Sequence, residues 1–259
     1  MKTTNLLTSV ALIASLGLVG CGGGGSVSAQ GTTAVSGTAI DPELQDATVC
    51  LDLNQDRNCT DGEPVATTDE NGNFSITVSD AQYQGSAPLL VIGGIDIATD
   101  KEFKGKLLAD INSTRQNITP LTTLAYNNTK AEMEKVENIL GLTAEEIEAN
   151  MITLANKGNT ASLKASLELQ KSAEAISPAD QLQFYTKLSE EIKASHQEDT
   201  LKTVILNITP NTIKTKLETL LTDIENANTS EPYTLAQDAE KKAIDLGIDY
   251  EKMMQQIPW

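Results

Sequence analysis

Oxygen-bearing side chains recur at fixed spacing between residues 52 and 63, and this spacing suits a calcium ion. Counted from Asp52, they stand at positions 1, 3 and 5, and a glutamate stands at position 12. In such a loop the alternate side chains surround a hard cation, position 7 adds a carbonyl, and the last carboxylate binds through both oxygens. Calcium is favoured over zinc because no histidine or free thiolate lies nearby. The predicted ligands are Asp52, Asn54, Asp56, Asn58 through its carbonyl, and Glu63.

The segment departs from an EF-hand in two respects. Position 6 is Arg57, where an EF-hand has glycine, and β-rich rather than helical segments flank the loop. Arg57 either neutralises part of the negative charge of the site or points to solvent. The alternative to a metal site is a solvated acidic turn that a disulfide between Cys50 and Cys59 holds closed.

The sequence offers no recognisable catalytic group. His196 is the only histidine, and its neighbours form no nucleophile elbow. The glycine run at residues 22–25 belongs to a tether rather than to a phosphate-binding loop. The acidic pairs Glu145-Glu146 and Glu190-Glu191 lie on predicted helix surfaces, where solvated faces are expected. We therefore expect a protein that is not an enzyme and has no catalytic residues.

Composition excludes one class of partner. The chain has 259 residues, with 19 basic against 36 acidic side chains and a formal charge of −17. A strongly anionic protein repels phosphate groups, so no nucleic-acid partner is expected. The same field raises the local concentration of cations. A hydrophobic content of 39% allows one or two cores but not a protein with many membrane spans.

The N-terminus has the features of an export signal. Lys2 precedes an apolar run, Leu6 to Val19, that is shorter than the roughly 20 residues of a membrane span. Residues 18–21, Leu-Val-Gly-Cys, match the lipobox of bacterial lipoproteins. This resemblance implies removal of a signal peptide at residues 1–20 and acylation of Cys21, by chains such as palmitate. The membrane then becomes a partner through the N-terminal lipid.

The residues after the lipobox predict the location of the protein. Gly22 is not the aspartate that retains many such lipoproteins at the inner membrane, so the resemblance implies the outer membrane or the cell surface. The Gly/Ser/Ala/Thr-rich segment 21–33 predicts a flexible tether. Once Cys21 carries lipid, Cys50 and Cys59 remain, and an oxidising compartment favours a disulfide between them.

Two hydrophobic periodicities divide the rest of the chain. Alternating β-rich runs extend to about Thr119, and a helical period follows. The dipeptide Asn71-Gly72 predicts a hairpin between the strands that flank it. We expect an α+β fold with a small antiparallel β-sandwich at residues 34–119 and a helical bundle at residues 120–259. The predicted strands are Thr33–Ile40, Ala47–Leu53, Pro64–Thr68, Asn73–Ser79, Leu89–Ile95 and Phe103–Ile111.

Apolar stripes and capping signals predict five to seven helices in the second half. Thr143 and Glu146 fit a capping box, and Pro178, Pro210 and Pro232 stand where helices would begin. The stripes are Ile147, Met151 and Leu154; Leu182, Tyr185, Leu188 and Ile192; Ile213, Leu217, Leu220, Leu221 and Ile224; and Ala236, Ala239, Ala243, Leu246, Tyr250 and Met253.

Four segments of the β-rich half resemble a known type of module: Val35 to Ile40, Ala47 to Asp52, Gly62 to Pro64 and Thr68 to Phe74. They are similar to the prealbumin-like repeats of bacterial surface proteins, the carboxypeptidase-regulatory-like and adhesin B-type modules. The resemblance implies a seven-stranded β-sandwich, often calcium-stabilised, that serves as a stalk or display unit. It also implies ligands at Asp52, Asn54, Asp56 and Glu63, with Asp61 and Asp69 as additions.

Three further segments, Val91 to Asp96, Ile118 to Leu124 and Leu163 to Lys171, resemble exported bacterial lipoproteins of unassigned role that pair a β-module with a helical domain. We therefore expect a lipid-anchored envelope or surface protein whose helical domain binds a protein or polymer. Two alternatives stay open: a carboxylate-dependent enzyme or enzyme subunit acting on envelope polymers, and a structural spacer. Two convergent acids in a pocket of the bundle would favour the enzyme, and a grooved helical surface would favour binding.

Overall fold

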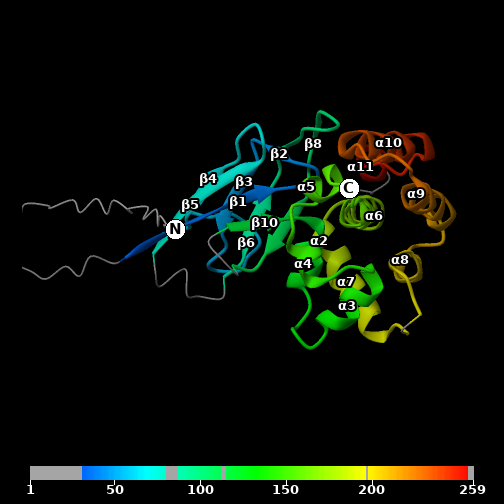
Figure 1. The fold of residues 1–259 in the computed structure, drawn as a ribbon, viewed down its shortest axis with the longest axis horizontal. Helices are drawn as coiled ribbons and strands as arrows, with labels where there is room; N and C mark the ends of the chain where they lie inside the picture. The colour runs from blue at the N-terminus through cyan, green and yellow to red at the C-terminus, as the bar shows by residue number, and fades with distance from the viewer. Residues whose placement is uncertain (1–30, 80–86, 112–114, 197, 256–259) are drawn as a thin grey trace, which may run out of the picture. The chain divides into compact units, whose positions relative to one another are not determined.

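The β-rich half precedes the helical half in the computed structural model, which confirms the α+β class (Figure 1). The structure describes residues 31–79, 87–111, 115–196 and 198–255, all within one compact unit, Gly31–Trp259. The change from strand to helix falls between β10 (Arg115–Ile118) and α2 (Pro120–Tyr126). The predicted signal peptide, with Cys21 and residues 22–30 of the tether, lies outside the described residues.

Three small sheets form the described β region. The first has the order β10-β1-β5, the second β4-β3-β6-β9 and the third β2-β7-β8. Their remaining strands are β1 (Thr32–Ala39), β2 (Leu44–Gln45), β3 (Thr48–Leu51), β4 (Val65–Thr67), β5 (Asn73–Ser79), β6 (Leu89–Ile92), β7 (Ile95–Asp96), β8 (Lys101–Glu102) and β9 (Lys106–Ala109). The strand pairs are antiparallel apart from β1 and β10, which are parallel. The predicted purely antiparallel arrangement is wrong at this pair.

The predicted strands also need correction in two respects. Thr32, expected in the tether, belongs to β1 and pairs with Ser79 of β5, one residue before the predicted start of the strand at Thr33. This pairing is formed by backbone hydrogen bonds and requires no apolar side chain. A search for hydrophobic periodicity therefore does not detect it. The short strands β2 and β8 escaped prediction because two residues carry no detectable periodicity, and the predicted strand Leu89–Ile95 is divided into β6 and the start of β7.

The predicted hairpin at Asn71-Gly72 is wrong in its pairing, although the turn is present. Gly72 has the left-handed backbone that the turn requires, with φ of 71°. β4 pairs with β3, whereas β5 pairs with β1, so the turn connects two sheets. Thr68 explains this crossing, because its Oγ1 donates to the Leu44 carbonyl at 2.5 Å and accepts from the Ala47 N–H at 2.8 Å.

The first two sheets share one hydrophobic core. Val35 and Ile76 of the first sheet and Val49 and Val91 of the second belong to the same buried cluster. The opposite face of the second sheet forms a separate cluster, in which Cys50, Leu90 and Leu108 contact side chains of α2 and α7. Both faces of this sheet are therefore covered, as burial of successive residues in β3, β6 and β9 requires.

Helix α2 covers the free edge of β9 through its threonines. Thr119 and Thr122 form a capping box at the start of the helix. Thr122 Oγ1 donates to the Leu108 carbonyl at 3.0 Å, and the Leu108 N–H donates to Thr123 Oγ1 at 2.9 Å. Side chains thus satisfy backbone groups that an edge strand would otherwise expose.

The helices of the described residues are more numerous than the five to seven predicted. They continue as α3 (Met133–Leu140), α4 (Ala144–Glu148), α5 (Met151–Asn156), α6 (Ala161–Ile176), α7 (Gln181–Ala194), α8 (Leu201–Ile208), α9 (Lys214–Asn226), α10 (Pro232–Leu246) and α11 (Tyr250–Met254). The predicted first stripe is split between α4 and α5, and the last is split at Gly247, which is left-handed. The capping box of Thr143 and Glu146 and the helix start at Pro232 are confirmed, whereas Pro178 and Pro210 stand in turns before their helices.

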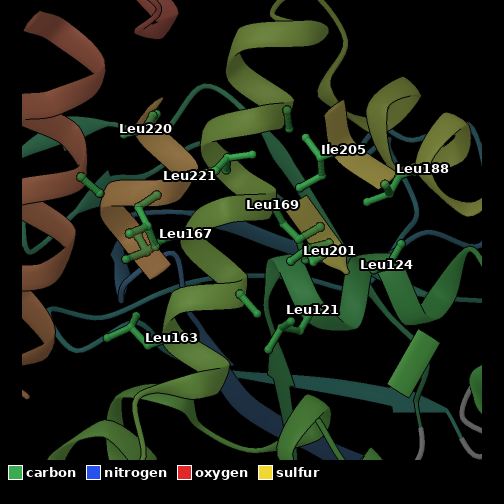
Figure 2. Close-up of a cluster of buried hydrophobic side chains, with 14 of the residues drawn as sticks. Leu121, Leu124, Leu163, Leu167, Leu169, Leu188, Leu201, Ile205, Leu220 and Leu221 are labelled. Atoms are coloured by element: carbon green, nitrogen blue, oxygen red, sulfur yellow. The ribbon is translucent and has the colours of Figure 1, made fainter. Parts of the chain in front are cut away.

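Helix α6 lies at the centre of the helical core, which Figure 2 shows in part. It contacts α2, α5, α7, α9 and α10. The labelled members of the core are Leu121, Leu124, Leu163, Leu167, Leu169, Leu188, Leu201, Ile205, Leu220 and Leu221. Within the residues that the structure describes, no helix combines the length and the apolar character needed to cross a bilayer.

Candidate functional site

The predicted disulfide between Cys50 and Cys59 is present and closes the acidic loop. Cys50 is buried on β3, and Cys59 lies nine residues later in the loop. The bridge packs on the side of the sheet that faces α2 and α7. Structural disulfides persist in oxidising compartments, so the bridge is consistent with an extracytoplasmic protein.

Asp52 organises the first half of this loop. Its side chain is completely buried, and its two carboxylate oxygens accept the N–H groups of Asp56 at 3.1 Å and Arg57 at 3.2 Å. Asn54 Oδ1 likewise accepts the Asp56 N–H, and Asp56 Oδ1 accepts the Asn58 N–H, so each side chain bonds to the backbone two residues ahead. The backbone therefore coils around the predicted ligand positions 1, 3 and 5.

Glu63 closes the loop from its other end. Its Oε1 accepts the Leu53 N–H at 2.8 Å, and its Oε2 accepts the Thr60 N–H at 2.9 Å. Positions 1 and 12 of the predicted site therefore both bond to the backbone of the same short loop. None of its carboxylates, Asp52, Asp56, Asp61 and Glu63, forms an ion pair with another described residue.

Arg57 has the backbone conformation that an EF-hand assigns to glycine at the same position. Its φ is 64°, in the left-handed region that ordinary residues adopt at some energetic cost. The sequence departs from the EF-hand pattern here, yet the turn is retained. The guanidinium lies over the ring of Tyr126, 5.1 Å from the ring centroid, which explains why the side chain does not simply point to solvent.

Lys106 of β9 brings a positive charge to the rim of the loop. Its Nζ donates to the Arg57 carbonyl and, at 3.0 Å, to Asn58 Oδ1. The side chain of Asn58 is thus engaged by a lysine. Sequence reasoning missed Lys106 because it lies 43 residues beyond Glu63 and no local spacing connects them.

The donor chemistry of the predicted ligand side chains fits calcium, since Asp52, Asp56 and Glu63 offer carboxylates and Asn54 offers an amide oxygen. In the structure the same oxygens accept hydrogen bonds from the loop itself. Among the described residues, no three or more His, Cys, Asp and Glu side chains form a group that could hold a metal ion. Asp69 instead accepts the N–H groups of Asn71 and Asn73, which lower its pKa, and Asp61 is exposed.

A buried ionic network lies where the helices meet the β region. Lys171 of α6 contacts Glu174 at 2.9 Å and Glu240 of α10 at 2.5 Å, and Lys101 of β8 also contacts Glu240 at 2.5 Å. Burial alone would lower the pKa of Lys171, but Glu174, Glu240 and Asp41 outweigh it and raise that pKa. In Figure 1, β8 lies beside α10, in agreement with the ion pair. No local pattern in the sequence indicates this network, because its members come from distant segments.

Glu168 of α6 is a second group that sequence reasoning missed. Its side chain is buried and makes no hydrogen bond with another described residue, and it lines a pocket of about 350 Å³. Desolvation, followed by the charge of Glu225, raises its pKa to about 8. Glu225 lines the same pocket and forms an ion pair with Lys202. One carboxyl is therefore neutral at pH 7 while its neighbour is held by a cation.

His196 does not belong to a catalytic arrangement among the described residues. It is exposed, and its backbone N–H donates to Asp199 Oδ2 at 2.7 Å. The neighbouring Ser195 Oγ donates to the Ile192 carbonyl at 2.7 Å, so that hydroxyl terminates α7.

Comparison with known proteins gave no match. No protein-family profile, curated protein or solved structure matches the chain. The resemblance to prealbumin-like modules therefore stays a prediction.

Proposed function

We propose that this chain is a lipid-anchored envelope or cell-surface binding protein, in which a calcium-stabilised, prealbumin-like β-sandwich carries a helical interaction domain. The observation that carries the proposal is the disulfide-closed loop from Asp52 to Glu63, with both terminal carboxylates bonded to its backbone. The common core of the first two sheets supports the sandwich. The lipid anchor rests on the lipobox at residues 18–21.

A bound calcium ion would neutralise the buried negative charge of this loop. Asp52 is a completely buried carboxylate without an ion pair among the described residues, and burial of an unpaired anion is unfavourable. Asp52, Asn54, Asp56 and Glu63 would hold the ion, which supplies two positive charges and braces the loop. Calcium has a structural role here and takes no part in a reaction.

The helical region offers a surface for a protein or polymer partner. A groove of about 260 Å³ lies between α9 and α10, and its floor is apolar, with Leu220, Ile224 and Leu235. Charged side chains, including Asp223, Asp238 and Lys242, stand around it. A grooved helical face with a polar rim is typical of a docking site and favours binding over a spacer.

Calcium titration of residues 22–259 tests the calcium part of the proposal. We expect saturable binding and a higher melting temperature, both lost in Asp52→Asn and Glu63→Gln. Glu70→Gln is the matched control, because Glu70 is exposed and lies outside the loop. An unchanged melting temperature of the wild type in the presence of a chelator would show that the loop is only a disulfide-held acidic turn.

One observation favours the second candidate, a carboxylate-dependent enzyme acting on envelope polymers. Glu168 is neutral at pH 7 and shares its pocket with Glu225, which pairs with Lys202, and glycoside hydrolysis uses two carboxyl groups in different environments. Incubation with envelope polysaccharides tests it. The enzyme would be established if the wild type and Glu218→Gln release reducing ends and Glu168→Gln does not. If the wild type releases none, binding remains the proposed function.

A further inference from the structure

A cavity of about 180 Å³ lies between the β region and the helices, next to the Lys171 network, and we call it the junction cavity. Its walls come from β7 and β8, from the segment after β1, and from α6, α10 and α11. An engineered cavity of similar volume in another protein accepts benzene, so this one has room for a small organic molecule or a few waters.

The lining of the junction cavity carries excess negative charge. Seven carboxyl groups and three lysines line it. Each lysine is already paired: Lys101 with Glu240, Lys104 with Glu251, and Lys171 with both Glu174 and Glu240. The three aspartates of the lining, Asp41, Asp96 and Asp249, have no lysine of their own among the described residues.

Two of these aspartates lack any hydrogen bond from the described part of the chain. Asp249 is 6% exposed, and its Oδ1 is buried without a partner although the residue precedes α11, where it could cap the helix. Asp41 is also 6% exposed, and no described group donates to its carboxyl. Asp96 differs, because it accepts the Ala98 N–H at 2.8 Å and the Thr99 hydroxyl at 2.7 Å. Buried polar groups nearly always have partners, so the unpartnered Asp249 Oδ1, in a cavity where Asp41 also lacks a donor, indicates a missing donor.

We propose that the junction cavity binds a small organic cation with an ammonium or guanidinium group, which donates hydrogen bonds to Asp41 and Asp249. A donor with several N–H groups satisfies both carboxylates and removes the excess negative charge. The cavity already stabilises one ammonium group by surrounding it with carboxylates, that of Lys171. Phe103 and Tyr250 add aromatic surface for the carbon skeleton of the ligand.

The electrostatics of the wild type supply a test that needs no variant. Burial raises the pKa of Asp41 and of Asp96, and a bound cation reverses this by favouring their charged forms. At a pH where Asp41 holds its proton in the free protein, binding therefore releases protons, and the heat of binding differs between two buffers of unequal ionisation enthalpy. The charged or titratable groups that face Asp41 are Lys171 and Glu174 of α6, Asp96 of β7, Tyr185 of α7 and Glu240 of α10.

The binding experiment is calorimetry on residues 22–259, which contain the whole described unit, with 1,4-diaminobutane and methylguanidine as probes. We expect saturable binding of at least one probe, with an affinity about tenfold or more weaker in Asp249→Asn and in Asp41→Asn. Asp46→Asn is the matched control, because it removes the same charge from an exposed position between β2 and β3 that lines no part of the junction cavity, and it should bind as the wild type does.

Three results would overturn the proposal. The first is the absence of saturable binding of both probes below about 10 mM. The second is equal affinity in the wild type and Asp249→Asn, or wild-type binding without proton release. The third is that Glu63→Gln still binds calcium whereas Asp249→Asn does not, because the cavity would then be a metal site. Each variant is first compared with the wild type by thermal melt, and the proton-release measurement decides if a variant does not fold.

Discussion

Replacement of Glu168 by glutamine is expected to stabilise the protein at neutral pH. The side chain is 5% exposed and has no hydrogen-bond partner among the described residues, so its ionised form is strongly disfavoured. Its pKa rises from the usual 4.5 to about 8 in the folded chain, first through desolvation and then through Glu225. Glutamine keeps the size of the side chain and removes the titration. The variant therefore isolates the free energy of this one ionisation.

The magnitude follows from the two pKa values. The folded chain holds the proton up to about pH 8, whereas the unfolded chain releases it near pH 4.5, so the folded state binds more protons between these values. Stability that Glu168 contributes below pH 4.5 is consequently lost as pH rises towards 8. Each pH unit corresponds to about 1.4 kcal/mol, so the loss reaches about 3 kcal/mol at pH 7. Glu168→Gln should escape this loss.

Urea unfolding followed by circular dichroism between about pH 5 and pH 8 measures the effect. The free energy of unfolding of Glu168→Gln minus that of the wild type should grow steadily with pH. Glu218→Gln, at an exposed position of α9, should show no such trend. If the curves of wild type and Glu168→Gln run parallel over this range, Glu168 is ionised or solvated in the folded protein, and the reasoning fails.

Three further substitutions test the packing of the β region by the same unfolding assay. Cys59→Ser opens the bridge to Cys50, and loss of a nine-residue crosslink should lower stability by about 2.5 kcal/mol, whereas no change would show that the bridge does not form. Gly37→Ala places a Cβ 1.9 Å from the Gln116 carbonyl and should destabilise by about 1–3 kcal/mol; a neutral result would contradict the parallel pairing of β1 and β10. Thr123→Val leaves a buried N–H of β9 without its acceptor, with an expected loss of about 1–3 kcal/mol, and wild-type stability would argue against the α2–β9 contact.

Local patterns predicted the elements of this fold better than their pairing. Asn73–Ser79 was predicted with its observed limits, because alternate burial of Phe74, Ile76 and Val78 gives a clear period of two. The turn at Gly72 was also predicted, but the pairing of its flanking strands was not. That pairing depends on Thr68, whose hydroxyl bonds to residues more than 20 positions away.

The residues of the candidate site also fall into those that local patterns predicted and those that depend on long-range contacts. The spacing from Asp52 to Glu63 indicated the loop because all its groups are local, and the bridge between Cys50 and Cys59 followed from the count of cysteines. Lys106 and the network around Lys171 were beyond sequence reasoning, since tertiary contacts between distant segments create them. No sequence pattern singled out Glu168, and the packing of α8 and α9 against α6 isolates it from water.

The polar residues of α6 argue against a purely structural spacer. Twelve of its 16 residues are buried, and six of these are polar: Ser162, Ser166, Glu168, Gln170, Lys171 and Ser172. Three of them, Ser166, Gln170 and Ser172, contain a buried atom without a hydrogen-bond partner in the described structure. Apolar side chains of similar size would stabilise such a helix at least as well, and buried groups that lower stability concentrate at functional sites. Glu168 and Lys171 line two different pockets from this one helix, so α6 is the element on which a binding or catalytic role would be built.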